Sequence, residues 1–398
     1  MKALRLGTFG LAAAAWIACA WLLLDDAVPG GLELPTVNVD ATFGAALVDE
    51  AERYERFLRV DWLLSQIVLL VVLWIYARKG VGFTRQSAAG PIGTGMLLGM
   101  LGLGIVWLVQ LPFGLAAVWW ERRYETTEIG YLEWALGDWL ALGAAFLSIC
   151  LALLVVMALA RWLGEHWWLP GTAVFVGIAA LFTFVSPYLV TTTRLEDPAL
   201  VAAARRYERQ QGLPEIPLRV EEVSGQTSQA NAYAVGLGPT RRVVLWDTLL
   251  DGRFSDGAER VVVAHELAHH SSDHLPKFLA WFALFAAPGA YLIMRVTRRR
   301  GGMGHPEAVP VALLVTAVFG LVVAPAENWI SRRMEAEADW KALQSTRDPV
   351  GARALFSGFA DTSLGDPSPP TWAYVMLETH PTLEQRVAMA DAWRARSP

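Results

Sequence analysis

Long apolar stretches without Asp, Glu, Lys or Arg are the feature that most restricts how this sequence can fold. A helix that crosses a bilayer needs about 20 mostly apolar residues, and a charge at its centre costs about 2.5–3.5 kcal/mol. Seven stretches meet or approach this requirement, namely 6–24, 62–77, 86–120, 139–160, 167–193, 278–294 and 308–326. The sequence therefore predicts a mainly α-helical, polytopic membrane protein with about seven transmembrane helices.

The composition agrees with this prediction and excludes several other classes. Hydrophobic residues make up 54% of the chain and charged residues 18%, below the roughly 25% of typical soluble domains. The 18 tryptophans fit a protein with two lipid–water interfaces. A net charge of −5 disfavours a nucleic-acid partner. The two cysteines lie inside apolar runs, so a cysteine-based zinc site is excluded.

Three details of the apolar stretches leave alternatives open. Stretch 6–24 is either a retained span or a cleaved signal peptide, and the lack of a clear small-residue cleavage site favours the span. The spacing of Gly95 and Gly99 indicates close helix packing, and Pro112 either kinks or ends its helix. Orientation stays open: ten Lys or Arg lie in short loops on the N-terminal side and five opposite, but the polar regions add arginines to the second side.

Two polar stretches interrupt the apolar pattern, and they divide the chain into four expected regions. These are a five-span region 1–193, a polar insert 194–277, two further spans within 278–326, and a helical tail 327–398. Four of the seven histidines lie between positions 265 and 274 of the insert. This concentration makes the insert the expected site of chemistry.

The insert contains His265-Glu266-Leu267-Ala268-His269, which has the His-Glu-x-x-His pattern of zinc peptidases. On a helix the two histidines lie one turn apart on one face and can bind one zinc ion, while Glu266 lies beside them as a base for water. Asp256 and Pro276 indicate the start and the end of that helix. With only seven histidines in 398 residues, chance gives about 0.007 such matches.

A catalytic zinc ion needs a third protein ligand, and no histidine follows at the required spacing. The tail begins with a helical pattern in which Glu335 and Asp339 share a face and Glu337 points away. Glu335 is therefore a candidate third ligand, and Asp339 a candidate to orient a ligand imidazole. A solvated acidic helix is the alternative interpretation of this pattern.

Together, these motifs resemble the type I CAAX prenyl proteases, which are seven-span membrane zinc endopeptidases related to the HtpX-type proteases. The resemblance rests on His265–His269, on Ser331-Arg332-x-x-Glu335-x-x-Ala338-Asp339, on Asn231-Ala232-Tyr233, and on His274 and Thr379-His380-Pro381 with Arg386. It implies one zinc ion bound by His265, His269 and Glu335, with Glu266 as catalytic base and His380 as oxyanion donor. It also implies a gluzincin-like α+β metalloprotease domain and makes Arg386 a substrate-binding candidate.

Residues 218–223, 230–235 and 241–246 have the alternation of short strands, which predicts a small sheet within the protease domain. An exposed strand edge beside zinc would hold a peptide through main-chain hydrogen bonds. Asn231 and Ala232 are the candidates for that edge. An ordinary hairpin core is the alternative.

The sequence therefore predicts a membrane zinc metalloendopeptidase, with the bilayer and a membrane-associated or lipidated peptide or protein as partners. Removal of C-terminal peptides from prenylated proteins and HtpX-like quality control are two roles for this chemistry. The excess of Arg over Lys suggests a bacterial plasma membrane. A non-catalytic zinc-binding sensor or scaffold is the competing class, but it would not need Glu266.

Overall fold

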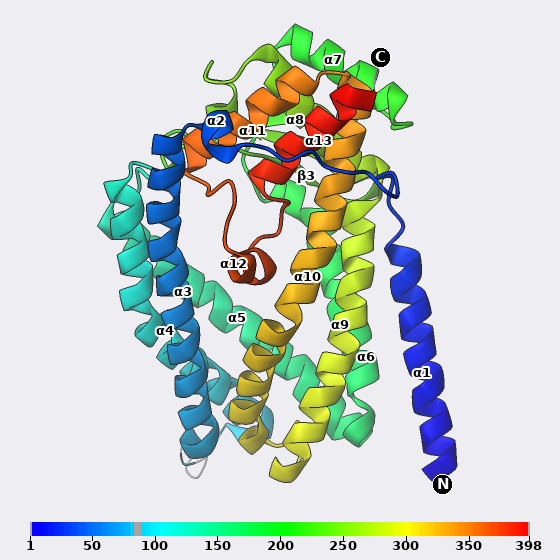
Figure 1. Cartoon of the computed structure of the whole chain (residues 1–398). Helices are drawn as coiled ribbons and strands as arrows, with labels where there is room; N and C mark the ends of the chain where they lie inside the picture. The colour runs from blue at the N-terminus through cyan, green and yellow to red at the C-terminus, as the bar shows by residue number, and fades with distance from the viewer. Residues whose placement is uncertain (1, 81, 83–88, 397–398) are drawn as a thin grey trace.

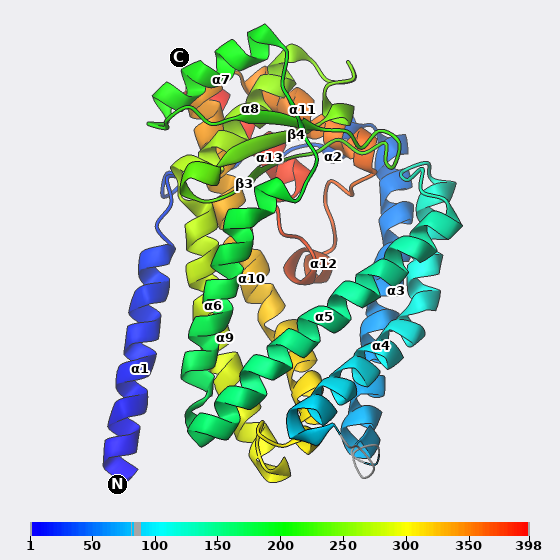
Figure 2. The same cartoon turned by 180° about the vertical axis from the view of Figure 1, so that it is seen from behind.

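Seven long helices dominate the computed structural model of the protein, which describes residues 2–80, 82 and 89–396. They stand side by side beneath a compact polar unit at one end (Figure 1, Figure 2). The long helices are α1 (Lys2–Leu23), α3 (Ala45–Lys79), α4 (Gly90–Arg123), α5 (Tyr131–Leu163), α6 (Trp168–Val185), α9 (His274–Thr297) and α10 (Val309–Thr346).

Six of these helices are long and apolar enough to cross a membrane in the described part of the chain, all except α1. Their outer faces carry exposed large side chains such as Leu140 and Leu147, at 72% and 74%, which require a lipid surround. The expected first span lies in α1, whose described side chains give only the shorter apolar helix Ala13–Leu23. Trp16 of this helix donates a hydrogen bond to the Leu284 carbonyl of α9 (2.8 Å). A seventh span stays a prediction.

Close packing of α4 against α5 depends on the two glycines that the sequence singled out. A Cβ atom at Gly95 would collide with Met157, and one at Gly99 with Leu153. The prediction that these glycines serve helix packing is therefore confirmed. Pro112 lies inside α4 and does not end it, while positions 86–88 of the predicted stretch lie outside the described residues.

The polar unit consists of a four-stranded sheet and several shorter helices. Its strands are β1 (Thr193–Arg194), β2 (Leu218–Glu221), β3 (Ala232–Val235) and β4 (Arg242–Trp246). They lie in the order β1-β2-β4-β3, with β2 and β4 parallel and the other pairs antiparallel. The predicted small sheet is confirmed, and β1 adds an unpredicted fourth strand at the boundary between the fifth span and the polar insert. β3 forms one edge of the sheet.

The remaining helices are shorter, and all of them except α12 pack around one apolar core with the sheet. They are α2 (Val39–Phe43), α7 (Pro198–Gln210), α8 (Asp256–Ser271), α11 (Pro349–Ser363), α12 (Thr371–Met376) and α13 (Leu383–Arg396). The core gathers side chains from most of these elements, including Tyr207, Leu245, Leu267 and Phe356, each at most 2% exposed. This core fixes the position of α8, the helix that carries the two histidines.

Two connections tie the polar unit to the spans. α8 ends at Ser271, and after a left-handed residue, Asp273 (φ 51°), the next helix α9 begins at once. Pro276 therefore lies in the first turn of α9, where proline is tolerated, and does not mark the end of α8. Ser255, and not Asp256, caps α8, since its side chain accepts from the Ala258 N–H.

The second connection is α10, a single helix of 38 residues. It contains the last predicted span and the Glu335 segment without a break, so the proposed regional boundary at 326/327 falls inside it. Glu335 is thus attached to the spanning part of α10 through helical backbone, although Pro325 within this stretch donates no helical hydrogen bond.

Candidate active site

Two helices bring three candidate metal ligands together. The Nε2 atoms of His265 and His269, one turn apart on α8, are 3.1 Å apart. Glu335 of α10 places Oε2 3.2 Å from His265 Nε2 and Oε1 3.6 Å from His269 Nε2. One potential ligand atom from each residue lies within 4.8 Å of the others. Residues separated by two spans in the sequence therefore meet at one point.

Asp339, one turn after Glu335, lies behind His265. Its Oδ1 is 2.8 Å from His265 Nδ1, and Arg386 donates two hydrogen bonds to the same carboxylate, at 2.8 and 2.7 Å. An Nδ1–H donated to Asp339 leaves the Nε2 lone pair free for a metal. Arg386 is thereby held on Asp339, and a contact of this residue with substrate stays a prediction.

A second pair of residues, His274 and Glu337, supports His269 from behind, and sequence reasoning missed it; we call this pair the relay. His269 Nδ1 is 2.9 Å from His274 Nδ1, and His274 Nε2 is 3.1 Å from Glu337 Oε2. If His274 donates Nε2–H to Glu337, its Nδ1 must accept from His269, which leaves His269 Nε2 free. Ser272 also donates to Glu337 (2.9 Å). Glu337 does point away from the zinc-facing side of α10, but it meets His274, the histidine already noted in the family resemblance.

These residues fit a bound cation. With both Nδ1–H groups donated outward, two Nε2 lone pairs face each other, and Glu335 Oε2 accepts no hydrogen bond within the described residues. Tetrahedral zinc with bonds of 2.0–2.1 Å separates its ligand atoms by about 3.3 Å. The observed separations of 3.1–3.6 Å are close to that value. The donor set and its spacing thus suit zinc.

Burial shifts the titration of the groups around this point. Burial raises the pKa of Glu266 to about 7, which suits a proton acceptor at neutral pH. Burial lowers the pKa of His269 to about 3, so this imidazole is neutral, the form that binds metal. For His265, burial lowers the pKa, but the nearby carboxylates of Asp339 and Glu335 outweigh it and raise the pKa to about 10. Metal binding must therefore displace a proton from His265.

A cavity of about 390 Å³ opens beside the three candidate ligands. Every residue predicted for the site lines it, except Asp339. Its remaining walls are mostly apolar and include Val262, Leu275, Phe278, Leu355 and Phe359. A cavity in which polar side chains converge opposite an apolar wall is typical of a site that binds organic substrates.

The edge strand β3 forms one wall of this cavity. The Trp246 N–H donates to the Asn231 carbonyl, and Ala232 pairs with Leu245, so the main-chain groups of Ala232 and Ala234 point away from β4. The Ala232 N–H bonds to the Asn231 side chain (2.8 Å), and the Ala234 backbone bonds to Glu266. Ala232 was predicted at this edge; Ala234 was missed, although the two-residue period of a strand implies it.

His380 lies at the mouth of the same cavity. Its Nε2 is 3.4 Å from Glu335 Oε2, and its side chain is 54% exposed. Thr379 Oγ1 lies 3.0 Å from His380 Nδ1. If the hydroxyl donates to Nδ1, the single proton of the neutral imidazole is on Nε2, which makes Nε2–H the donor that faces the cavity. His270, in contrast, bonds to the Arg242 carbonyl (3.1 Å), which ties α8 to β4.

Comparison with known proteins identifies relatives of this chain. The sequence pattern of peptidase family M48 matches residues 194–394. An uncharacterized metalloprotease, YhfN of Bacillus subtilis, is 25% identical over 353 residues, which cover 83% of this chain and 80% of YhfN. A CAAX prenyl protease 1 homolog of Oryza sativa is 26% identical over 218 residues. That match covers 52% of this chain and only 51% of the rice protein.

The fold has a counterpart among solved structures. The crystal structure of S. mikatae Ste24p matches with a TM-score of 0.66 over 97% of this chain and 96% of that chain. At 18% identity, this likeness shows the fold alone. The predicted class, a polytopic helical membrane protein with a small sheet, is therefore confirmed.

Replacement of Glu337 with Gln tests the relay behind His269. The amide keeps the size of the side chain but no longer offers a charged acceptor to His274, so the orientation of His269 is weakened. We expect zinc affinity to fall roughly 10- to 100-fold, measured by competition with a chelator.

Glu327→Gln, on the same helix but outside the relay, is the matched control and is expected to bind zinc like the wild type. Equal zinc affinity in Glu337→Gln and wild type would show that the relay does not position His269.

Proposed function

The chain belongs to peptidase family M48 and is a multi-pass membrane zinc metalloprotease, and we propose which residues carry its chemistry. His265, His269 and Glu335 hold the zinc ion, and Glu266 is the catalytic base. The observation that carries this proposal is the meeting of three ligand atoms within 4.8 Å in the cavity that Glu266 also lines. A zinc ion held there supplies Lewis acidity and lowers the pKa of water toward 7.

Glu266 performs the proton transfers in this proposal. Its buried carboxylate takes a proton from the attacking water and passes it to the nitrogen of the leaving amine. The hydrogen bond from the Ala234 backbone and the helical position beside His265 fix the carboxylate toward the cavity. A purely structural zinc site has no use for a buried base in this position, which disfavours the sensor or scaffold alternative.

His380 is the proposed donor to the carbonyl oxygen of the scissile bond. Negative charge develops on that oxygen during attack, and a fixed N–H donor stabilises it. The exposed Nε2, 3.4 Å from Glu335 Oε2, lies close enough to the ligands to meet a carbonyl that approaches the metal.

The edge of β3 is the proposed binding surface for substrate main chain. Ala232 and Ala234 offer their outward carbonyls at two-residue spacing, which matches an extended peptide, while the Ala234 N–H stays on Glu266. The Asn231 side chain occupies the Ala232 N–H and must give way to a substrate carbonyl.

N-methylation of alternate substrate amides should weaken binding at every second position only, and equal loss at all positions would contradict this mode.

The natural substrates are proposed to be polypeptides associated with the membrane, because two of the six candidate spans, α9 and α10, are continuous in sequence with the elements that carry the site. Two roles fit: release of C-terminal peptides from prenylated proteins, and HtpX-like turnover of membrane proteins in a bacterial plasma membrane. A proteomic comparison of cells that carry wild type or Glu266→Gln distinguishes them. Accumulated prenylated precursors support the first role, and accumulated multi-span proteins without lipid support the second.

The variant Glu266→Gln tests the proposed chemistry directly. It removes the proton acceptor and keeps the side-chain size, so peptide cleavage should fall by at least about 100-fold while zinc content stays unchanged. Cleavage is measured on a peptide library by mass spectrometry.

The matched control is Glu259→Gln, on the same helix and outside the cavity, which should cleave at the wild-type rate. If Glu266→Gln retains zinc and cleaves as fast as the wild type, the protease mechanism proposed here is wrong.

His380→Ala separates stabilisation of the reacting oxygen from metal binding. We expect kcat to fall roughly 100- to 1000-fold, with zinc content and KM close to wild type. His166→Ala, at the opposite end of the molecule, is the control. A kcat near wild type for His380→Ala would remove this residue from the mechanism.

A further inference from the structure

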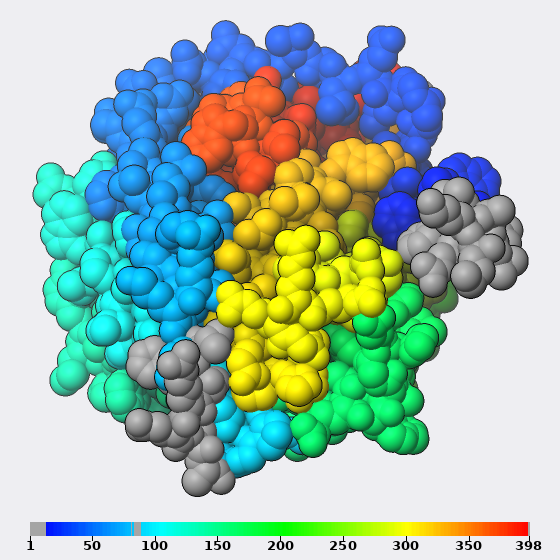
Figure 3. All heavy atoms as spheres, turned by 90° about the horizontal axis from the view of Figure 1, so that it is seen from below, coloured from blue at the N-terminus to red at the C-terminus, as the bar shows by residue number. Residues whose placement is uncertain are grey.

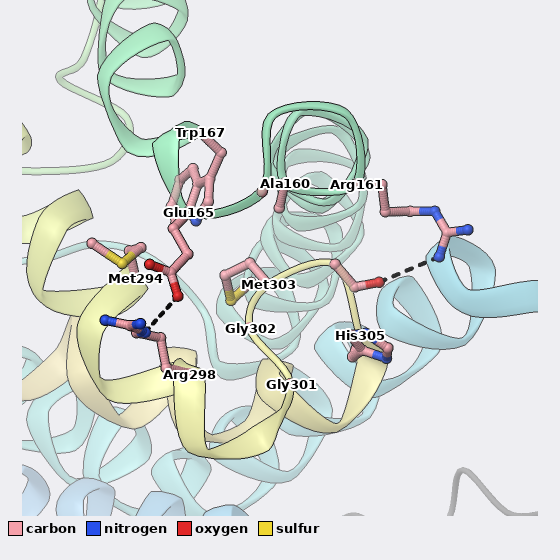
Figure 4. A pocket seen from close by; sticks show the side chains of 12 residues that line it. Ala160, Arg161, Glu165, Trp167, Met294, Arg298, Gly301, Gly302, Met303 and His305 are labelled. Atoms are coloured by element: carbon pink, nitrogen blue, oxygen red, sulfur yellow. Dashed lines mark hydrogen bonds and ion pairs between the residues drawn. The ribbon is translucent and has the colours of Figure 1, made fainter.

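A second polar cavity lies at the end of the bundle opposite to the zinc site, the end that faces the viewer in Figure 3. Its volume is about 750 Å³. Three segments form it: the end of α5 with η2 (Gly164–His166), the end of α9 with η6 (Arg298–Arg300), and the glycine-rich loop before η7 (Pro306–Ala308). Figure 4 shows these segments around the opening, with Met303 between them.

Two arginines line this cavity, and only one of them has an acidic partner. Arg298 Nε lies 2.5 Å from Glu165 Oε1, and both side chains are about half exposed, at 45% and 53%. Arg161 donates a long bond (3.5 Å) to the Gly304 carbonyl and meets no carboxylate among the described residues. The cavity therefore has a net positive charge that can accept an anion.

The surface around the opening is also basic. At this end the helices are connected by three segments of the chain. Their described residues, 78–80 with 82, 161–167 and 295–308, hold seven Lys or Arg and two glutamates. The basic residues are Arg78, Lys79, Arg161, Arg295, Arg298, Arg299 and Arg300. Such clusters at the ends of membrane helices attract anionic lipid headgroups.

An apolar cavity of about 430 Å³ lies directly beside the basic one. Trp167 and Met303 line both cavities and are each 3% exposed, so they form a shared wall. The apolar cavity lies between α5, α6, α9 and α10, and its lining includes Leu153, Phe175 and Ile293. A charged cavity at the end of the spans matches the headgroup of a phospholipid, and the apolar cavity next to it matches the acyl chains.

We propose that the basic cavity binds the phosphate-bearing headgroup of an anionic phospholipid. Arg298 contacts the phosphate oxygens, since the guanidinium fork matches that group, and Trp167 lies at the boundary between headgroup and acyl chain. Arg161, on the other side of the glycine-rich loop (Figure 4), adds positive charge to the cavity without contacting the same phosphate. Glu165 competes with the phosphate for Arg298. Free phosphate shares this chemistry, but the apolar cavity and the position at the ends of the spans favour the lipid.

Lipid titration of the full-length protein tests this proposal. Delipidated protein in a neutral detergent is titrated with dioleoyl-phosphatidylglycerol or with dioleoyl-phosphatidylcholine, and bound lipid is counted by native mass spectrometry. We expect phosphatidylglycerol to bind more tightly. Arg161→Gln and Arg298→Gln should each weaken it about fivefold, while Arg299→Gln, the same change outside the cavity, should not.

Glu165→Gln provides a test that does not depend on loss of function. Release of Arg298 from its partner should strengthen phosphatidylglycerol binding, whereas a purely structural ion pair would give no such gain. Zinc content serves as the check that each variant is folded.

Three results would overturn the proposal. Equal affinity for the two lipids would show that charge is not recognised. Equal loss in Arg299→Gln and the two cavity variants would assign binding to the basic surface in general. Millimolar inorganic phosphate would be the true ligand if it displaced phosphatidylglycerol and raised the melting temperature of the protein as much as the lipid does.

Discussion

The approach of Glu335 to His265 and His269 is the contact on which the rest of this structure depends. Three buried polar side chains place their unshared electron pairs toward one point, and such a group is costly unless a cation occupies it. The outward nitrogens of both imidazoles already face partners: His265 Nδ1 lies 2.8 Å from Asp339 Oδ1, and His269 Nδ1 is hydrogen-bonded to His274. Removal of either outer bond would allow an imidazole to turn its lone pair away.

Two features of the fold hold that contact in place, and both involve the membrane spans. α8 passes into α9 within two residues, and α10 runs without a break from the last span to Glu335. The histidines are therefore attached to one span by a two-residue turn, and the glutamate belongs to the same helix as the other span. The spans thus act as part of the scaffold of the active site as well as anchoring it.

Much of this arrangement could be predicted from residue patterns, but some of it could not. The i, i+4 spacing placed His265 and His269 on one face, and strand alternation located β2, β3 and β4, because both signals are local. The Glu337–His274 contact depends on how α8, α9 and α10 cross, which no local pattern contains. The same reason hid the basic cavity: His305 gave no signal alone, and Arg161 and Arg298 line one cavity only because distant connections come together.

Zinc content per chain in Glu335→Ala tests the central claim most directly. The account predicts about one zinc ion per wild-type chain and a large loss in Glu335→Ala, with Glu327→Ala, earlier on the same helix, unchanged. Elemental analysis of purified protein after dialysis against a weak chelator provides the measurement. Full zinc occupancy in Glu335→Ala would contradict the claim that a span-borne carboxylate completes the metal site.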